Sequence, residues 1–162
     1  MIRKLLSTDD DGATALLRVV LGAVFFAHGA QKMLGWFGGF GFSATMGMFT
    51  SMLHIPPPLA FLAIAAEFFG GLGLVVGFLT RIASLGICVN MLVAIGMVHR
   101  FFGFFMNWSG AQKGEGVEYH LLVLAMTAFL MMRGAGAFSV DRAVAMETSA
   151  QPSGVPNSKS VL

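Results

Sequence analysis

Ten polar side chains interrupt apolar stretches of this sequence, and they are the residues that could carry chemistry. They are Arg18, His28, Gln31, Lys32, Glu67, Asn90, His99, Arg100, Glu118 and His120. Glu67 is the most informative, because residues 59–79 are otherwise apolar or glycine and are long enough to cross a bilayer as a helix. An acid at that depth costs at least about 2.5–3.5 kcal/mol to insert, so it must face protein or a wet cavity. We therefore expect Glu67 to be buried and matched by a donor.

Several of the other polar groups fall toward one end of the predicted helices. Residues 28–32 end one helix, residues 99–100 follow another, and residues 118–120 begin a third. A cavity at this end with Glu67 at its floor suits a quinone headgroup, because His or Tyr can donate to a carbonyl while a carboxylate exchanges protons. The sequence thus predicts proton handling by Glu67 and His28, and a quinone pocket formed by Lys32, Glu118 and His120 with support from Arg18 and Asn90.

Simpler structural roles compete with these assignments. The donor to Glu67 could be Arg18, His28, Asn90 or His120, and we favour His28 because it lies deep in the first helix. His28 could equally form an ordinary hydrogen bond between helices, and Asn90 is more simply explained by such a contact. Arg18 lies near a helix start, from which its side chain could extend to the membrane surface. Glu118 and His120 point about 200° apart on a regular helix, so they cannot both face one pocket there.

The histidines offer a rival, metal-based use. Residues 28, 54, 99 and 120 lie on separate predicted elements, and none of them forms an HxxxH or ExxH pair on one helix. A haem held by two histidines from different helices is an alternative to quinone, although nothing in the spacing singles it out. We predict no metal site. The single cysteine, Cys88, excludes an internal disulfide and CxxC thiol chemistry carried by this chain alone.

Four apolar segments must position these side chains, at about residues 13–34, 59–79, 82–98 and 118–133. The chain of 162 residues is 56% hydrophobic and 11% charged, with a net charge of +2. Soluble domains carry about 25% charged residues, so the composition indicates a membrane protein. The basic residues are scattered, which does not indicate nucleic-acid binding. We predict an all-α, polytopic membrane protein with a bundle of four transmembrane helices.

Two long aromatic connections join these segments. In residues 35–58, four apolar side chains recur at helical spacing and predict an interfacial or re-entrant helix: Phe42, Met46, Phe49 and Leu53. Residues 99–117 hold phenylalanines and Trp108, which are typical of the membrane–water interface. With four spans, seven lysines and arginines lie on one side and three on the other, which predicts that both termini are cytoplasmic.

The domain organisation follows from composition. Residues 1–12 form a polar cytoplasmic arm whose aspartates are expected to cap the first helix. Residues 13–142 form the membrane domain. Residues 143–162 are predicted to be a disordered cytoplasmic tail, because most of them lie in a stretch rich in Ser, Pro and Gly.

Four motifs resemble the DoxX family: Arg18 with HGAQKML, AEFFGGLGLVVGFLTR, GFFMNWSGAQKGEGVEYHLL and RGAGAFSVDR. They cover about residues 13–142, and their order and spacing together make the resemblance specific. The resemblance implies a four-helix protein of the bacterial inner membrane. The family name derives from a small subunit of a terminal oxidase and thiosulfate:quinone oxidoreductase system. Relatives linked to thiol redox chemistry carry a cysteine pair that this chain lacks.

The function expected from the residues and the resemblance is that of a small membrane subunit in a quinone-linked redox complex. The chain has no flavin, iron–sulfur or nicotinamide motif, so a partner subunit would carry the redox cofactor. The alternative is a non-catalytic membrane scaffold or a module that binds lipid or quinone. Expected partners are the lipid bilayer and the cofactor-bearing subunit, with a second copy of the chain as a further candidate.

Overall fold

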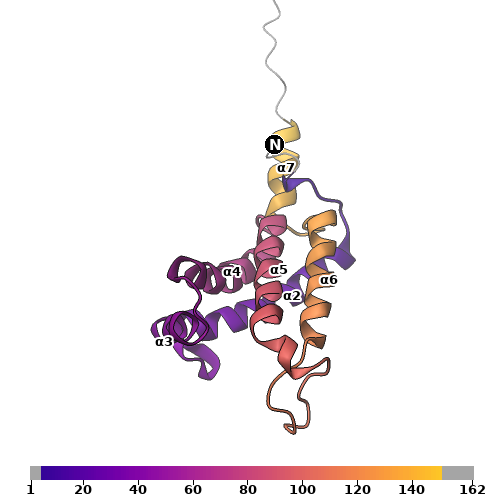
Figure 1. Cartoon of the computed structure of the whole chain (residues 1–162). Coiled ribbons are helices and arrows are strands. Elements are labelled where there is room, and N and C mark those ends of the chain that lie inside the picture. Colours follow the sequence, from indigo (N-terminus) through magenta and orange to yellow (C-terminus); the bar gives the residue numbers. More distant parts are fainter. Residues whose placement is uncertain (1–4, 151–162) are drawn as a thin grey trace, which may run out of the picture.

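The computed structural model describes residues 5–150, and every regular element in that range is helical (Figure 1). The longer helices are α2 (Gly12–Met33), α4 (Pro57–Val76), α5 (Thr80–Met97), α6 (Glu118–Arg133) and α7 (Val140–Ala150). Shorter helical turns lie in the connections: η1 (Trp36–Gly38), α3 (Gly41–Gly47), the π-helical η2 (Met48–Met52) and η3 (His99–Phe102). The predicted all-α fold is therefore confirmed for the described part of the chain.

Within residues 5–150, three helices are long and apolar enough to cross a membrane, namely α2, α4 and α5. Their ends differ by one to three residues from those of the predicted segments 13–34, 59–79 and 82–98. Helix α6 coincides with the predicted segment 118–133, but its 16 residues are fewer than the about 20 that cross a typical hydrocarbon core. Three helices of spanning length are thus established, and the fourth span remains a prediction.

Helices α2 and α4 pack in direct backbone contact because glycines line their crossing. A Cβ atom on Gly71 would lie 2.3 Å from the amide nitrogen of Phe26, and one on Gly29 would lie 2.4 Å from the Cα of Phe68. Small residues at such positions let two helices approach closely. Helices α5 and α6 run side by side and cross the α2–α4 pair in the view of Figure 1, and α4 packs against α5. The floor of the candidate site forms where α2, α4 and α5 meet.

Arg18 holds segments together by hydrogen bonds at the end of the bundle opposite the two aromatic connections. Its side chain is only 1% exposed. The guanidinium donates five hydrogen bonds to backbone carbonyls, those of Leu74, Val75, Ala135, Ala137 and Phe138. Two of these carbonyls end α4, where intrahelical donors are lacking, and the other three lie in the turn after α6, so Arg18 joins the two segments. The expectation that Arg18 extends to the membrane surface is therefore wrong.

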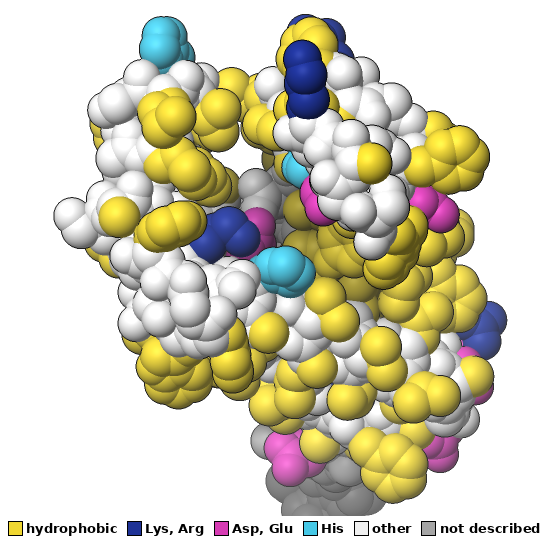
Figure 2. Space-filling view, turned by 90° about the horizontal axis from the view of Figure 1, so that it is seen from below, with side chains coloured by type: hydrophobic (Ala, Val, Ile, Leu, Met, Phe, Trp, Pro, Cys, Tyr) yellow, Lys and Arg dark blue, Asp and Glu magenta, His cyan; other side chains and the backbone are white. Residues whose placement is uncertain are grey.

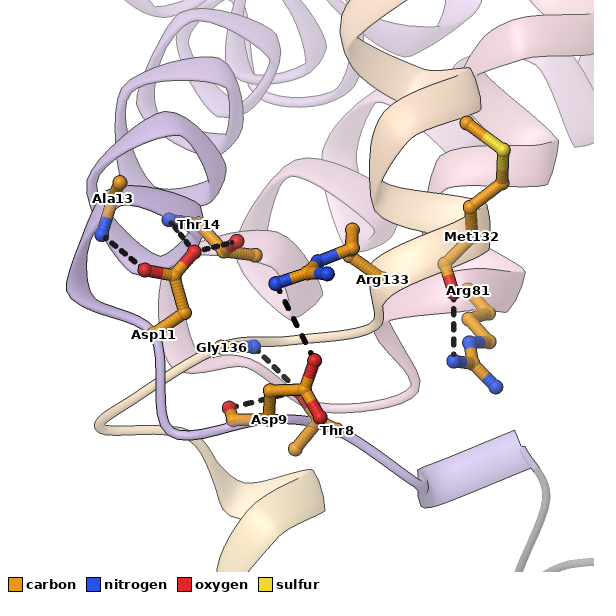
Figure 3. Close-up of polar contacts among 9 residues, drawn as sticks. All are labelled: Thr8, Asp9, Asp11, Ala13, Thr14, Arg81, Met132, Arg133 and Gly136. Atoms are coloured by element: carbon orange, nitrogen blue, oxygen red, sulfur yellow. Dashed lines mark hydrogen bonds and ion pairs between the residues drawn. The ribbon is translucent and has the colours of Figure 1, made fainter.

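The N-terminal arm crosses this same end of the bundle (Figure 3). Asp11 caps α2 by accepting hydrogen bonds from the amides of Ala13 and Thr14, which confirms the predicted aspartate cap. The Gly136 amide donates to the Thr8 hydroxyl at 2.6 Å. Arg133 forms an exposed ion pair with Asp9 at 3.4 Å. The arm is thus tied to the turn between α6 and α7.

Two sequence predictions need correction on residues that the structure describes. Residues 143–150 of the predicted disordered tail belong to α7, and residues 151–162 lie outside the described range. A helix does form within 35–58, but as α3 followed by the π-helical η2 rather than as one regular helix, and Thr45 in it is 2% exposed. The short α3 packs against α2 and α4, which covers Thr45. Whether this helix lies on or dips into a membrane remains a prediction.

Candidate functional site

Glu67 joins three helices through its two carboxylate oxygens. Lys32, at the end of α2, forms an ion pair with Oε2. Asn90 on α5 donates from Nδ2 to Oε1 at 2.9 Å and to the carbonyl of Ala63 at 3.3 Å. The Glu67 side chain is 8% exposed and that of Lys32 is 24% exposed. The carboxylate is therefore buried and matched, as an acid in a membrane-spanning helix must be.

The end of the bundle that holds this pair is hollowed. Figure 2 shows a recess on this face, with a basic and an acidic side chain together at its floor and histidine side chains at its walls. The Lys32 side chain is partly exposed, so water or a ligand can contact it, whereas Glu67 lies deeper. A lysine ammonium has three N–H donors and no acceptor, so donors remain for a ligand oxygen after the ion pair has formed. The arrangement can bind an acceptor group and hold a proton beside it.

The structure contradicts the favoured pairing of Glu67 with His28. His28 is exposed, and the donors to Glu67 are Lys32 and Asn90. Lys32 lies one helical turn beyond His28, and its longer side chain reaches the carboxylate from the helix end. Arg18 does not join the site, because it is bound at the opposite end of the bundle. The interpretation of Asn90 as a polar contact between helices is confirmed.

Glu118 holds the second aromatic connection. Its Oε2 accepts a hydrogen bond from the amide of Met106 at 3.1 Å, and its own amide donates to the carbonyl of Phe104. Glu115 likewise accepts from the amide of Asn107 at 2.6 Å. These contacts fold the loop back on the start of α6. Glu118 and His120 thus have different surroundings, in keeping with their wide separation around the helix axis.

His120 is buried beside a second histidine. It is 5% exposed, and its ring contacts that of His99 with centroids 4.0 Å apart and the ring planes tilted by 43°. His99 Nδ1 contacts the carbonyl of Glu115 at 2.8 Å, which fixes its ring. Two imidazoles whose centroids are this close leave no space for a porphyrin between them, so this pair is not arranged for haem ligation. Within the described residues, no group of three or more His, Cys, Asp or Glu could hold a metal ion.

Tyr119 is a site residue that the sequence prediction omits. Its hydroxyl is buried and has no hydrogen-bond partner among the described residues, and the same holds for Nδ1 of His120. Tyr119 lies within electrostatic reach of the Glu67 carboxylate. The sequence could have pointed to Tyr119 through its position beside His120 in the first turn of α6. Only the packing of α6 against the other helices brings it toward Glu67.

The aromatic connection at 99–117 also carries a shallow groove of about 450 Å³. The groove is lined by Phe101, Phe102, Gly103, Phe104, Phe105, Gln112 and Lys113. It contains neither Glu67 nor its partners, and the aromatic rings around it are largely exposed, with Trp108 at 87%. These side chains suit the headgroup region of a bilayer, as the sequence pattern indicates.

Comparison with known proteins agrees with this architecture. The DoxX family model matches residues 13–100. "Putative oxidoreductase CatD" of Bacillus subtilis (strain 168) is 28% identical over 128 residues, which cover 79% of this chain and 84% of the relative. "Inner membrane protein YqjF" of Escherichia coli (strain K12) is 29% identical over 133 residues, which cover 82% of this chain and 92% of the relative. No solved structure matches the chain significantly. Because the family match spans more than half of the chain, and three of its helices have membrane-crossing length, this protein belongs to the DoxX family of membrane proteins.

Proposed function

We propose that this protein is a bacterial inner-membrane subunit of a redox complex, which binds a quinone headgroup in the recess above Glu67 and exchanges protons with it. One observation carries the proposal: Lys32, Glu67 and Asn90 form a hydrogen-bonded group in which the carboxylate is buried and the lysine is partly exposed, and Figure 2 shows a recess with a basic and an acidic side chain together at its floor. The names of the two relatives, one an oxidoreductase and one an inner membrane protein, support the activity class and the location.

The residues of the recess fit such a ligand. A bound quinone supplies the electron acceptor, and becomes a quinol by taking up two electrons and two protons. Electrons would come from the cofactor of a partner subunit, since this chain has no motif for one. The Lys32 ammonium would donate a hydrogen bond to a ligand oxygen and hold a proton there. Glu67 would keep that ammonium charged and oriented, and His28 on the exposed side of α2 would exchange protons with water.

Topology completes the proposal. We infer four spans, with α6 as the short fourth, and both termini in the cytoplasm, because seven basic residues lie on that side and three on the other. The recess would then open toward the periplasmic side. A reporter that works only in the cytoplasm should be active when it is fused after Leu162. Activity of a reporter that works only in the periplasm, fused at the same position, would contradict this orientation.

The decisive experiment compares Glu67→Gln with Glu67→Ala in membranes. The amide of Gln keeps the shape of Glu and one acceptor oxygen but cannot hold the charge, so quinone-dependent respiratory activity per unit of membrane protein should fall, with membrane abundance higher than in the Ala variant. The Ala variant should lose both, because Lys32 and Asn90 are left without their acceptor. Glu147→Gln, an exposed carboxylate on α7, serves as the matched control. Normal activity of the Gln variant at normal abundance would contradict proton handling.

A second candidate function is a non-catalytic scaffold or lipid-binding module. It is favoured by the same triad, because Asn90 also binds the carbonyl of Ala63 and the three side chains tie α2, α4 and α5 together. Purified protein can be extracted with solvent and the extract separated by chromatography. Stoichiometric quinone supports the first function, and lipid without quinone supports the second.

A further inference from the structure

The first turn of α6 carries two buried polar groups that the proposed proton chemistry does not use. His120 is 5% exposed, and its Nδ1 has no hydrogen-bond partner among the described residues. The hydroxyl of its neighbour Tyr119 is likewise buried and unpartnered there. Buried polar atoms in folded proteins are nearly always hydrogen-bonded, so two adjacent exceptions need an explanation. A ligand that accepts hydrogen bonds is one.

These groups lie at the same end of the bundle as the charged triad. Tyr119 is within electrostatic reach of Glu67. His120 is held in place by a tilted ring contact with His99 at a centroid distance of 4.0 Å, and its ring also packs edge-on against that of Tyr119 at 5.6 Å. His99 is itself fixed by the carbonyl of Glu115. Tyr119 and His120 are therefore positioned by protein contacts, while the Tyr119 hydroxyl and the Nδ1 atom of His120 have no hydrogen-bond partner among the described residues.

Both parts of this end of the bundle offer hydrogen-bond donors. Lys32 retains N–H groups after pairing with Glu67, the Tyr119 hydroxyl can donate, and His120 can donate in its Nδ1–H tautomer. A ligand with one acceptor oxygen would bind either Lys32 or the pair Tyr119 and His120, but not both. A planar ligand with acceptor oxygens at both ends, a para-dione, would use both.

We propose that Tyr119 and His120 form a second anchor of the recess, which binds the far carbonyl of a para-quinone while Lys32 binds the near one. This inference rests on the proposed function and adds to it the residues that select a dione over a compound with a single carbonyl. It assigns to the start of α6 a binding role that is separate from the proton handling at Glu67.

The test measures Kd for two probes by calorimetric titration of the full-length protein in detergent. The probes are para-naphthoquinone and alpha-tetralone, which share a fused two-ring skeleton but have two carbonyls and one. All measurements use a Cys88→Ala background, because quinones add to thiols and Cys88 is the single cysteine. The variants are Tyr119→Phe and His120→Phe. Thr80→Val is the matched control. It removes another buried hydroxyl without a hydrogen-bond partner among the described residues, at the start of α5, whereas the proposed anchor lies near the end of that helix.

The background protein should bind the quinone roughly tenfold more tightly than the ketone, which is the effect of about one good hydrogen bond. In Tyr119→Phe this preference should fall toward unity while Thr80→Val retains it. If Tyr119→Phe does not fold, as judged by its thermal unfolding midpoint, His120→Phe provides the same comparison. Tight quinone binding with an unchanged preference in the folded α6 variant would overturn the second anchor and leave the proposed function standing. Failure of the background protein to bind either probe would overturn both.

Discussion

Lys32 on α2 and Glu67 on α4 form an ion pair between residues 35 positions apart in the sequence, and Asn90 on α5 holds the other carboxylate oxygen. The pair is asymmetric, because the glutamate is almost covered and the lysine is a quarter exposed. The carboxylate therefore depends on its partners for stabilisation, whereas the lysine side chain keeps some contact with solvent. This difference leads to the first prediction.

Replacing Lys32 alone should destabilise the protein strongly. In Lys32→Met the Glu67 carboxylate stays buried without its counter-charge, and breaking such a pair costs about 3 kcal/mol, the low end of the usual range. The double variant Lys32→Met with Glu67→Gln should recover most of this loss, because no unpaired charge remains. Thermal unfolding in detergent measures both. The exposed Lys113→Met is the control, and a Lys32→Met variant as stable as this control would show that the pair contributes nothing.

The contact between α2 and α4 should not tolerate a methyl group at Gly71. Its Cβ would lie 2.3 Å from the backbone nitrogen of Phe26, so the helices must separate. Overpacking of this kind costs about 1–3 kcal/mol and should also disturb the pairing of Lys32 with Glu67. Gly96→Ala on α5 is the control, since nothing lies within 4 Å of its Cβ position and alanine favours helix by up to about 1 kcal/mol. Equal unfolding midpoints for the two alanine variants would contradict the close crossing.

Arg18 should not be replaceable by lysine. Its guanidinium makes five hydrogen bonds to carbonyls, whereas a lysine ammonium has three donors and no planar fork. The loss of two charge-assisted hydrogen bonds should lower stability by about 3 kcal/mol and reduce membrane abundance. Arg133→Lys, at an exposed ion pair with Asp9, should cost less than about 1 kcal/mol. If both variants accumulate like the wild type, the hydrogen bonds of Arg18 do not stabilise the fold.

Asp11 should make the N-terminal cap sensitive to acid. Hydrogen bonds from the Thr14 hydroxyl, first, and from the amides of Thr14 and Ala13 hold the pKa of the Asp11 carboxyl below its usual value. The unfolded chain therefore binds this proton more readily than the folded one. The stabilisation is fully present above about pH 4, the ordinary pKa of aspartate, and is lost as the pH falls through the lower folded pKa. Thr14→Val should raise the pKa of Asp11, which NMR titration of the carboxyl carbon would measure. An unchanged pKa in that variant would assign the shift to the amides alone.

The sequence by itself determined that the four long apolar segments are helical and that Glu67 needs a partner. The run of apolar residues in 59–79 predicts a membrane-length helix, and a lone acid within it is energetically acceptable only when matched. It also predicted the aspartate cap of α2, because capping depends on residues within one turn. Such inferences succeed because the interactions behind them are local in the chain or follow from a single transfer free energy.

Only the tertiary structure decided which residues meet. Helical periodicity gives the face of each helix but not the depth at which two helices cross, and that depth is set here by glycines such as Gly29 and Gly71 in backbone contact. It brings Lys32 rather than His28 to Glu67, and it places Arg18 at the far end among carbonyls of α4 and the turn after α6. The polar atoms of Tyr119 and His120 are likewise buried only by the packing of α6. Partners distant in sequence depend on the relative rotation and displacement of whole helices, a property that the composition of no single helix specifies.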